Sequence, residues 1–97
     1  MEVKVRFFTS LREIVGKREE ILSFSEREIV TVDLVLKTLS KKYGTSFTKY
    51  VYDEKTGKPK IFLQFLVSGT SISTLNSLET RLKVGDVLAI LPPVGGG

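Results

Sequence analysis

Cysteine and histidine are both absent from this 97-residue sequence, and each absence excludes a class of chemistry. Without cysteine the chain has no disulfides, no thiolate metal site and no thiol nucleophile. Without histidine it lacks the side chain most often used as a general base and as a metal ligand. Any reaction must therefore use carboxylates, lysines, hydroxyl groups or a chain terminus, and we expect no catalytic side chain and no metal site.

Long apolar runs are missing as well. The longest, residues 61–67, is interrupted by Gln64 and is far too short to span a bilayer. Residues 1–8 alternate apolar and charged side chains, which is typical of a strand and not of a signal peptide. We therefore expect a cytoplasmic protein without a membrane partner.

Acidic residues are outnumbered by basic ones, which gives a net charge of +4. A basic protein can bind nucleic acid or an acidic partner. Here the basic residues are spread along the chain, and the aromatic residues do not alternate with them as a base-stacking surface requires. The pattern favours a solvated, lysine-rich surface over a nucleic-acid site.

The first half of the chain shows a strand, a short helical turn, a second strand and a long helix. Residues 2–7 place Val3, Val5 and Phe7 on one face of a strand. Ser10 is a candidate cap for a short helical turn that Gly16 ends, and residues 20–24 form the second strand. The long helix is predicted to begin after Thr31 as N-cap, with Asp33 in its first turn, and to end at Gly44. Its apolar stripe consists of Val32, Val35, Leu36, Leu39 and Tyr43.

The second half predicts further strands and leaves one segment open. Residues 45–53 fit either a short helix or a packed loop, and residues 54–59 fit an exposed turn. A strand is expected at 61–67, a tight hairpin turn at 68–70 with a short return strand at 71–73, and a final strand at 87–91. This order predicts an α+β fold of the β-grasp (ubiquitin-like) type, a mixed sheet with one main helix on one face.

The C-terminal residues are the part of the sequence that indicates a function. Two prolines fix φ and favour an extended exit from the last strand, and three glycines follow after one valine. We expect a β-grasp domain at 1–93 and a flexible tail at 94–97 that reaches about 13–14 Å. Such a tail fits a passage too narrow for a Cβ atom, and ATP can activate its carboxylate as an acyl-adenylate. The alternative is a frayed end or a cloning remnant. The residues expected to be recognised are Pro92, Pro93, Val94, Gly95 and Gly96.

Two stretches of the sequence resemble a known family. Residues 5–16 (VRFFTSLREIVG) are similar to the opening strand and helical turn of the small subunit of molybdopterin synthase and its sulfur-carrier and archaeal modifier relatives. Residues 82–94 (LKVGDVLAILPPV) match the closing pattern of that MoaD/ThiS-like family. This chain has Ser68-Gly69 where the family commonly has Asn-Gly, and Gly95 where it commonly has a small polar residue. Residues 45–60 match the family least.

The resemblance implies a carrier and not an enzyme. An E1-like enzyme that uses ATP would adenylate Gly97, and sulfide or a persulfide would convert it to a thiocarboxylate. The expected function is sulfur donation in molybdopterin (molybdenum cofactor) biosynthesis, with the catalytic residues supplied by the large synthase subunit. One alternative is a modifier that forms an isopeptide bond between Gly97 and lysines of target proteins. A second alternative, which does not rest on the tail, is a passive β-grasp binding module. No cofactor is expected to be bound by the chain itself.

A partner surface is expected on the sheet. Both apolar strands, 61–67 and 87–91, have apolar side chains on both faces, and a helix covers only one face. The exposed residues are therefore Phe62 and Leu66 or Leu88 and Ile90, since strand parity alone does not separate the two sets. The alternative is that residues 47–52 cover this face.

Overall fold

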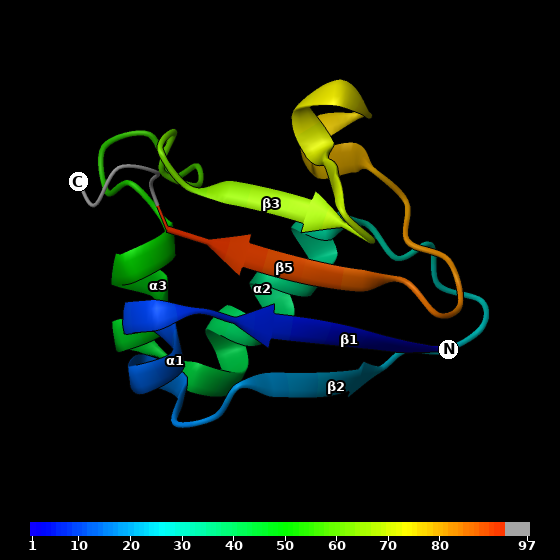
Figure 1. Cartoon of the computed structure of the whole chain (residues 1–97), viewed down its shortest axis with the longest axis horizontal. Helices are drawn as coiled ribbons and strands as arrows, with labels where there is room; N and C mark the ends of the chain where they lie inside the picture. The colour runs from blue at the N-terminus through cyan, green and yellow to red at the C-terminus, as the bar shows by residue number, and fades with distance from the viewer. Residues whose placement is uncertain (93–97) are drawn as a thin grey trace.

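A mixed sheet with helices on one side forms the protein, and the computed structural model describes residues 1–92 (Figure 1). The elements are the strands β1 (Glu2–Phe7), β2 (Glu19–Ser23), β3 (Gln64–Val67), β4 (Thr70–Ser71) and β5 (Val87–Leu91), the helices α1 (Thr9–Val15), α2 (Val32–Tyr43) and α3 (Thr45–Val51), and the 3₁₀ turns η1 (Ile72–Thr74) and η2 (Ser77–Glu79).

The strands lie in the order β2-β1-β5-β3-β4, so the last strand of the chain occupies the middle of the sheet. β1 pairs antiparallel with β2 and parallel with β5, and β5 pairs antiparallel with β3. The parallel pair places Val5 opposite Leu88 and Phe7 opposite Ile90. The prediction of a mixed sheet is confirmed, and residues Leu88 to Ile90 of β5 pair with a neighbouring strand on both sides.

The core lies between the sheet and α2. Val3 and Val5 of β1 are fully buried, as the alternation predicts. The helix also follows its sequence signals: the Leu34 amide donates to the Thr31 hydroxyl (3.1 Å), and the helix ends at Gly44. Its predicted stripe faces the sheet, with Val32, Val35, Leu36 and Leu39 fully buried and Tyr43 packed at the edge of the core.

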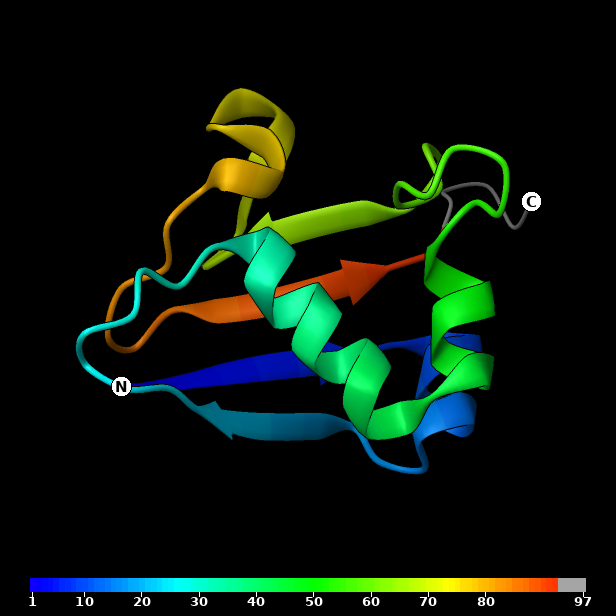
Figure 2. The same cartoon turned by 180° about the vertical axis from the view of Figure 1, so that it is seen from behind.

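The two shorter helices complete the covered side of the sheet (Figure 2). In α1 the prediction for Ser10 is wrong: Phe8 holds the N-cap position, so Ser10 lies inside the first turn. Gly16 ends that helix as predicted, because it adopts the left-handed conformation that favours glycine, at φ 78°. The segment left open between helix and loop is the helix α3, which buries Phe47 and Val51.

The strand predicted at 61–67 begins only at Gln64. The Lys60 amide donates to the Val51 carbonyl (2.8 Å) and the Leu63 amide to the Lys60 carbonyl (3.2 Å), so this stretch turns against the end of α3 instead of joining the ladder. Ser68 and Gly69 form the predicted hairpin turn, both with positive φ. The return strand is shorter than predicted, because the chain enters the turn η1 at Ile72.

Candidate functional site

Strand β5 ends at Leu91, next to the last residue that the structure describes. Leu91 still pairs with Gln64 of β3, and Pro92 follows without an amide hydrogen to continue the ladder. The other residues predicted to be recognised, Pro93, Val94, Gly95 and Gly96, and the predicted reactive residue Gly97 lie outside the described residues. The predicted domain boundary after residue 93 lies there too, so both remain predictions.

One face of the sheet is left uncovered by helices, as Figures 1 and 2 show from the two sides. We call this surface the open face. Its side chains alternate along each strand with the buried ones. The open face consists of Glu2, Lys4, Arg6, Glu19, Ile21, Ser23, Gln64, Leu66, Ser71, Val87, Ala89 and Leu91.

The structure shows which of the two sets of strand residues faces outward, a question that the sequence left open. Leu88 and Ile90 are 0% and 1% exposed and point into the core, so the prediction of a partner surface at these two residues is wrong. They face inward because Leu88 pairs with the buried Val5 across the parallel ladder. Leu66 is half-buried on the open face. A role for Leu66 in binding a partner stays a prediction.

An apolar strip runs along the middle of the open face. Leu66 lies beside Ala89, with Val87 and Leu91 before and after it on β5. Basic and acidic groups border the strip on β1 and β2: the Lys4 Nζ and Arg6 Nε lie 3.9 and 3.8 Å from the Glu19 carboxylate. An apolar centre with a charged border is typical of a surface that docks another protein. Helix α3 packs against α2 and α1, so the alternative that residues 47–52 cover this face is wrong.

Phe62 lies at the same end of the sheet as Pro92. It is 55% exposed, and neighbouring Ile61 is 99% exposed, because the turn against α3 keeps both out of the ladder. β3 runs antiparallel to β5, so the start of β3 adjoins the end of β5. An exposed aromatic side chain thus lies at the same end of the sheet as Pro92, the last residue that the structure describes. A role for Phe62 in binding a partner stays a prediction.

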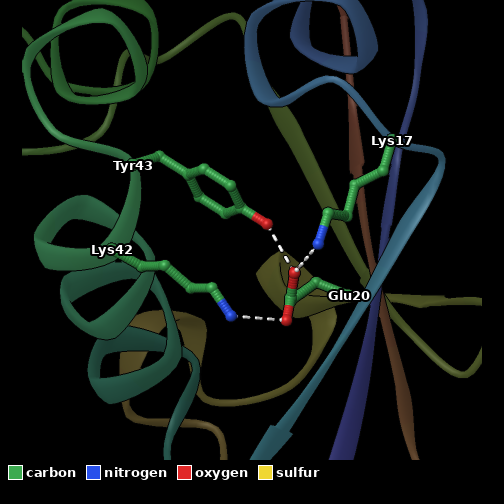
Figure 3. Close-up of polar contacts among 4 residues, drawn as sticks. All are labelled: Lys17, Glu20, Lys42 and Tyr43. Carbon is green, nitrogen blue, oxygen red and sulfur yellow. Dashed lines mark hydrogen bonds and ion pairs between the residues drawn. The ribbon is translucent and has the colours of Figure 1, made fainter.

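A charged cluster on the covered side joins β2 to the end of α2 (Figure 3). The Glu20 side chain is 8% exposed and accepts three hydrogen bonds. Lys17 donates to its Oε1 (2.8 Å), Lys42 to its Oε2 (2.7 Å), and the Tyr43 hydroxyl also donates to Oε1. The carboxylate therefore ties two segments that lie more than twenty residues apart in the sequence.

The three hydrogen bonds shift the pKa values of the cluster. Those from Lys17, Lys42 and Tyr43 lower the pKa of Glu20 from 4.5 to about 2 and outweigh the opposing effect of its burial. Burial, followed by the hydrogen bond to Glu20, raises the pKa of the Tyr43 hydroxyl. Glu20 is therefore ionised at neutral pH, and the cluster acts as a structural brace.

Comparison with known proteins identifies the family. The sequence profile of the ThiS family matches residues 5–97, which is nearly the whole chain. The chain belongs to the ThiS family. The match includes both the central strand β5 and the C-terminal glycines.

Individual relatives of this ThiS-family chain have two kinds of name. It is 31% identical to small archaeal modifier protein 3 of Haloferax volcanii over the full length of both chains. It is 29% identical, again over both full lengths, to a protein of Archaeoglobus fulgidus that is named, provisionally, as a sulfur carrier. The solution structure of small archaeal modifier protein 1 from Methanosarcina acetivorans superposes with a TM-score of 0.78 at 40% identity, covering 99% of this chain and 96% of that one.

These likenesses confirm the predicted β-grasp, ubiquitin-like fold for this member of the ThiS family. None of the helices formed by residues 1–92 is long and apolar enough to cross a membrane. Within the same residues, no three carboxylate side chains gather closely enough to hold a metal ion.

The Glu20 cluster of this ThiS-family chain was not predicted from the sequence. Residues 20–24 were expected to form a strand, and Tyr43 was expected to belong to the apolar stripe of the long helix. A signal was available: Glu20 is two residues from Leu22, so it occupies an inward position on its strand. A charged residue at an inward position requires partners, although the sequence does not say which ones.

Proposed function

We propose that this chain carries sulfur on its last residue, Gly97, and donates it in molybdopterin synthesis. The ThiS-family match over residues 5–97 carries this proposal, because it covers the domain and the glycine terminus together. An E1-like enzyme is the activating partner, and the large subunit of molybdopterin synthase is the acceptor. The described residues contribute a docking surface and a fixed starting point for the C-terminus.

Activation converts an unreactive carboxylate into an acyl group that a nucleophile can attack. The Gly97 carboxylate attacks the α-phosphate of ATP, which gives an acyl-adenylate and pyrophosphate. Hydrosulfide then attacks the carbonyl carbon, AMP leaves and a thiocarboxylate remains. ATP is bound by the activating enzyme, and this chain supplies only the carboxylate.

Conjugation to proteins is a second candidate function. It is favoured by the names of two full-length relatives, which are small archaeal modifier proteins. The two functions share the acyl-adenylate. In conjugation a lysine amine of a target protein attacks the same carbonyl carbon, and an isopeptide bond forms as AMP leaves.

Reconstitution tests the proposed function and separates it from conjugation. The full chain is incubated with the host's E1-like enzyme, ATP and sulfide, and the product is then given to the large synthase subunit with the sulfur-free pterin precursor. Formation of molybdopterin supports the proposal. Failure of the thiocarboxylated chain to yield molybdopterin, with a known small subunit working in parallel, refutes it; lysine conjugates in host extract would then support the modifier.

The open face provides a prediction about activation. Leu66→Glu places a charge in the middle of the apolar strip, and we expect the KM of the E1-like enzyme for this chain to rise about tenfold, which is about 1.4 kcal/mol of binding. Ile21→Glu is the matched control, because Ile21 is an exposed apolar residue on the outer strand β2 of the same face. Steady-state pyrophosphate release measures both. Equal KM values for Leu66→Glu and the unchanged chain would show that this strip does not dock the enzyme.

A further inference from the structure

The covered side of the protein carries a groove that the proposed function does not use. It lies between α2 and α3 and is closed at one end by the turn at residues 53–57, with a volume of about 900 Å³. Leu34 and Thr38 of α2 line one wall, and Thr48 of α3 lines the other. Tyr52 adds an aromatic ring near the turn. The Leu34 side chain, the Tyr52 ring and the threonine methyl groups thus give the inside of the groove an apolar surface.

Lysines surround this groove. Lys37 and Lys41 lie one turn apart on α2, so they project from the same side of that helix. Lys49 stands on α3, and an adjoining hollow that shares Lys49 and Tyr52 with the groove adds Lys55 and Lys60.

Acidic groups do not cancel this charge. Of the two acidic residues that line the groove, Asp53 is engaged in its own turn, where its Oδ1 accepts hydrogen bonds from the amides of Lys55 (2.7 Å) and Thr56 (3.2 Å). Glu54 is the other. Lys37 pairs with Asp33 (3.0 Å) but is largely exposed, and exposed pairs of this kind are weak. The groove and the adjoining hollow together have five lysines, at positions 37, 41, 49, 55 and 60, against the three carboxylates of Asp33, Asp53 and Glu54, so the rim is positive overall.

The groove is separate from the open face. It is formed by helices that pack on the opposite side of the sheet, as Figure 2 shows. It is also built largely from residues 45–60, the segment of the sequence that least resembles the sulfur-carrier family. A ligand bound here would not compete for the apolar strip around Leu66.

We propose that this groove binds a short acidic segment of a partner protein. An aliphatic side chain of that segment enters between α2 and α3, and its carboxylates pair with Lys41 and Lys49 at the rim. Among the described residues that line the groove, Tyr52 is the one aromatic, so the site lacks the row of rings on which successive nucleic-acid bases would stack. The same groove is suited to one aliphatic side chain flanked by negative charge.

A defined peptide tests the proposal. The probe is a fluorescein-labelled peptide, Glu-Asp-Leu-Glu-Leu-Asp-Glu, titrated with the full chain and followed by fluorescence anisotropy and by amide NMR shifts. We expect saturable binding with shifts at α2, α3 and residues 52–57. A peptide with serine in place of both leucines, and a single-stranded oligouridylate, are expected to bind at least about tenfold more weakly.

Charge-reversal variants locate the site. Lys41→Glu with Lys49→Glu is expected to weaken probe binding about tenfold or more. Arg81→Glu with Lys83→Glu is the matched control, because it makes the same charge change at exposed positions that do not line the groove. Lys41→Gln with Lys49→Gln repeats the test with a milder change.

An equal loss of binding in the groove and control pairs, equal binding of the serine peptide, or tighter binding of oligouridylate would overturn the proposal, as would shifts confined to the open face. Because these readouts need neither ATP nor an activating enzyme, their failure is distinct from a failure of the proposed sulfur transfer.

Discussion

Deletion of Gly96 and Gly97 is expected to abolish thiocarboxylate formation and to leave the free energy of unfolding unchanged within about 0.5 kcal/mol. The shortened chain still ends in glycine, but its carboxylate falls about 7 Å short of its reach in the full chain. A shift of that size removes the reacting group from the activating site, and far smaller displacements cost about a hundredfold in rate. We expect stability to be unaffected because the core formed by residues 1–92 lies between Val3 and Ile90.

Mass spectrometry of the activation reaction measures thiocarboxylate formation, and urea denaturation measures the free energy of unfolding. A useful control is Gly96→Ala with Gly97→Ala, which keeps the length and adds only two methyl groups. Partial activity in this control and none in the deletion would show that the length of the C-terminal segment matters more than the width of the site that accepts it. A deletion variant that gains sulfur at the original rate would contradict a reactive end at Gly97.

Glu20→Gln is expected to destabilise the fold by about 2 kcal/mol at pH 7. The substitution keeps the size of the side chain but removes the charge that accepts hydrogen bonds from Lys17, Lys42 and Tyr43. Both ammonium groups are about half exposed, so water compensates part of the loss. Urea denaturation measures the cost. Glu13→Gln serves as the control, because Glu13 is exposed on α1, and it is expected to change stability by less than about 0.5 kcal/mol.

The pH dependence of this cost follows from the lowered pKa of Glu20. The carboxyl titrates near 4.5 in the unfolded chain and at about 2 in the folded one, so the folded state holds the ionised form more strongly. Its contribution is complete above pH 4.5 and is lost as the pH falls from 4.5 towards 2. The stability difference between the original chain and Glu20→Gln should therefore narrow over this range. A difference that stays constant from pH 7 to pH 2 would show that the charge of Glu20 does not brace the fold.

Local patterns in the sequence were enough to predict most of the architecture. The alternation of Val3, Val5 and Phe7 fixed the buried face of β1, and the cap at Thr31 set the start of α2. These signals act over a few residues, where backbone geometry and side-chain spacing decide the outcome. The resemblance at residues 82–94 predicted β5 and the family, and the match to the ThiS profile confirmed it.

Features that depend on distant contacts could not be predicted. Residues 61–63 have strand-like side chains, yet the hydrogen bond from Lys60 to Val51 turns them out of the sheet. The inward direction of Leu88 follows from its pairing with β1, eighty residues earlier in the chain. Glu20 meets its partners only after α2 has packed on the sheet. In each case the deciding contact joins segments that a local pattern cannot relate.

The groove on the covered side could not be predicted either, because it forms only when separate segments pack together. Its lysines are spread over α2, α3 and the turn after them, and in the sequence they are typical of a solvated surface. Packing α3 against α2 brings them around an apolar hollow. On the two proposals, the open face binds the partner that activates the chain, and the groove on the covered side binds a partner that supplies an acidic segment.

Fragmentation of the activated chain in a mass spectrometer tests the central claim most directly. The full chain is treated with the E1-like enzyme, ATP and sulfide, and the products are fragmented along the backbone. The account predicts a mass increase equal to the replacement of one oxygen by sulfur, carried only by C-terminal fragments that contain Gly97. An unmodified Gly97, with the enzyme active on another carrier, or sulfur on fragments from residues 1–92 would contradict it.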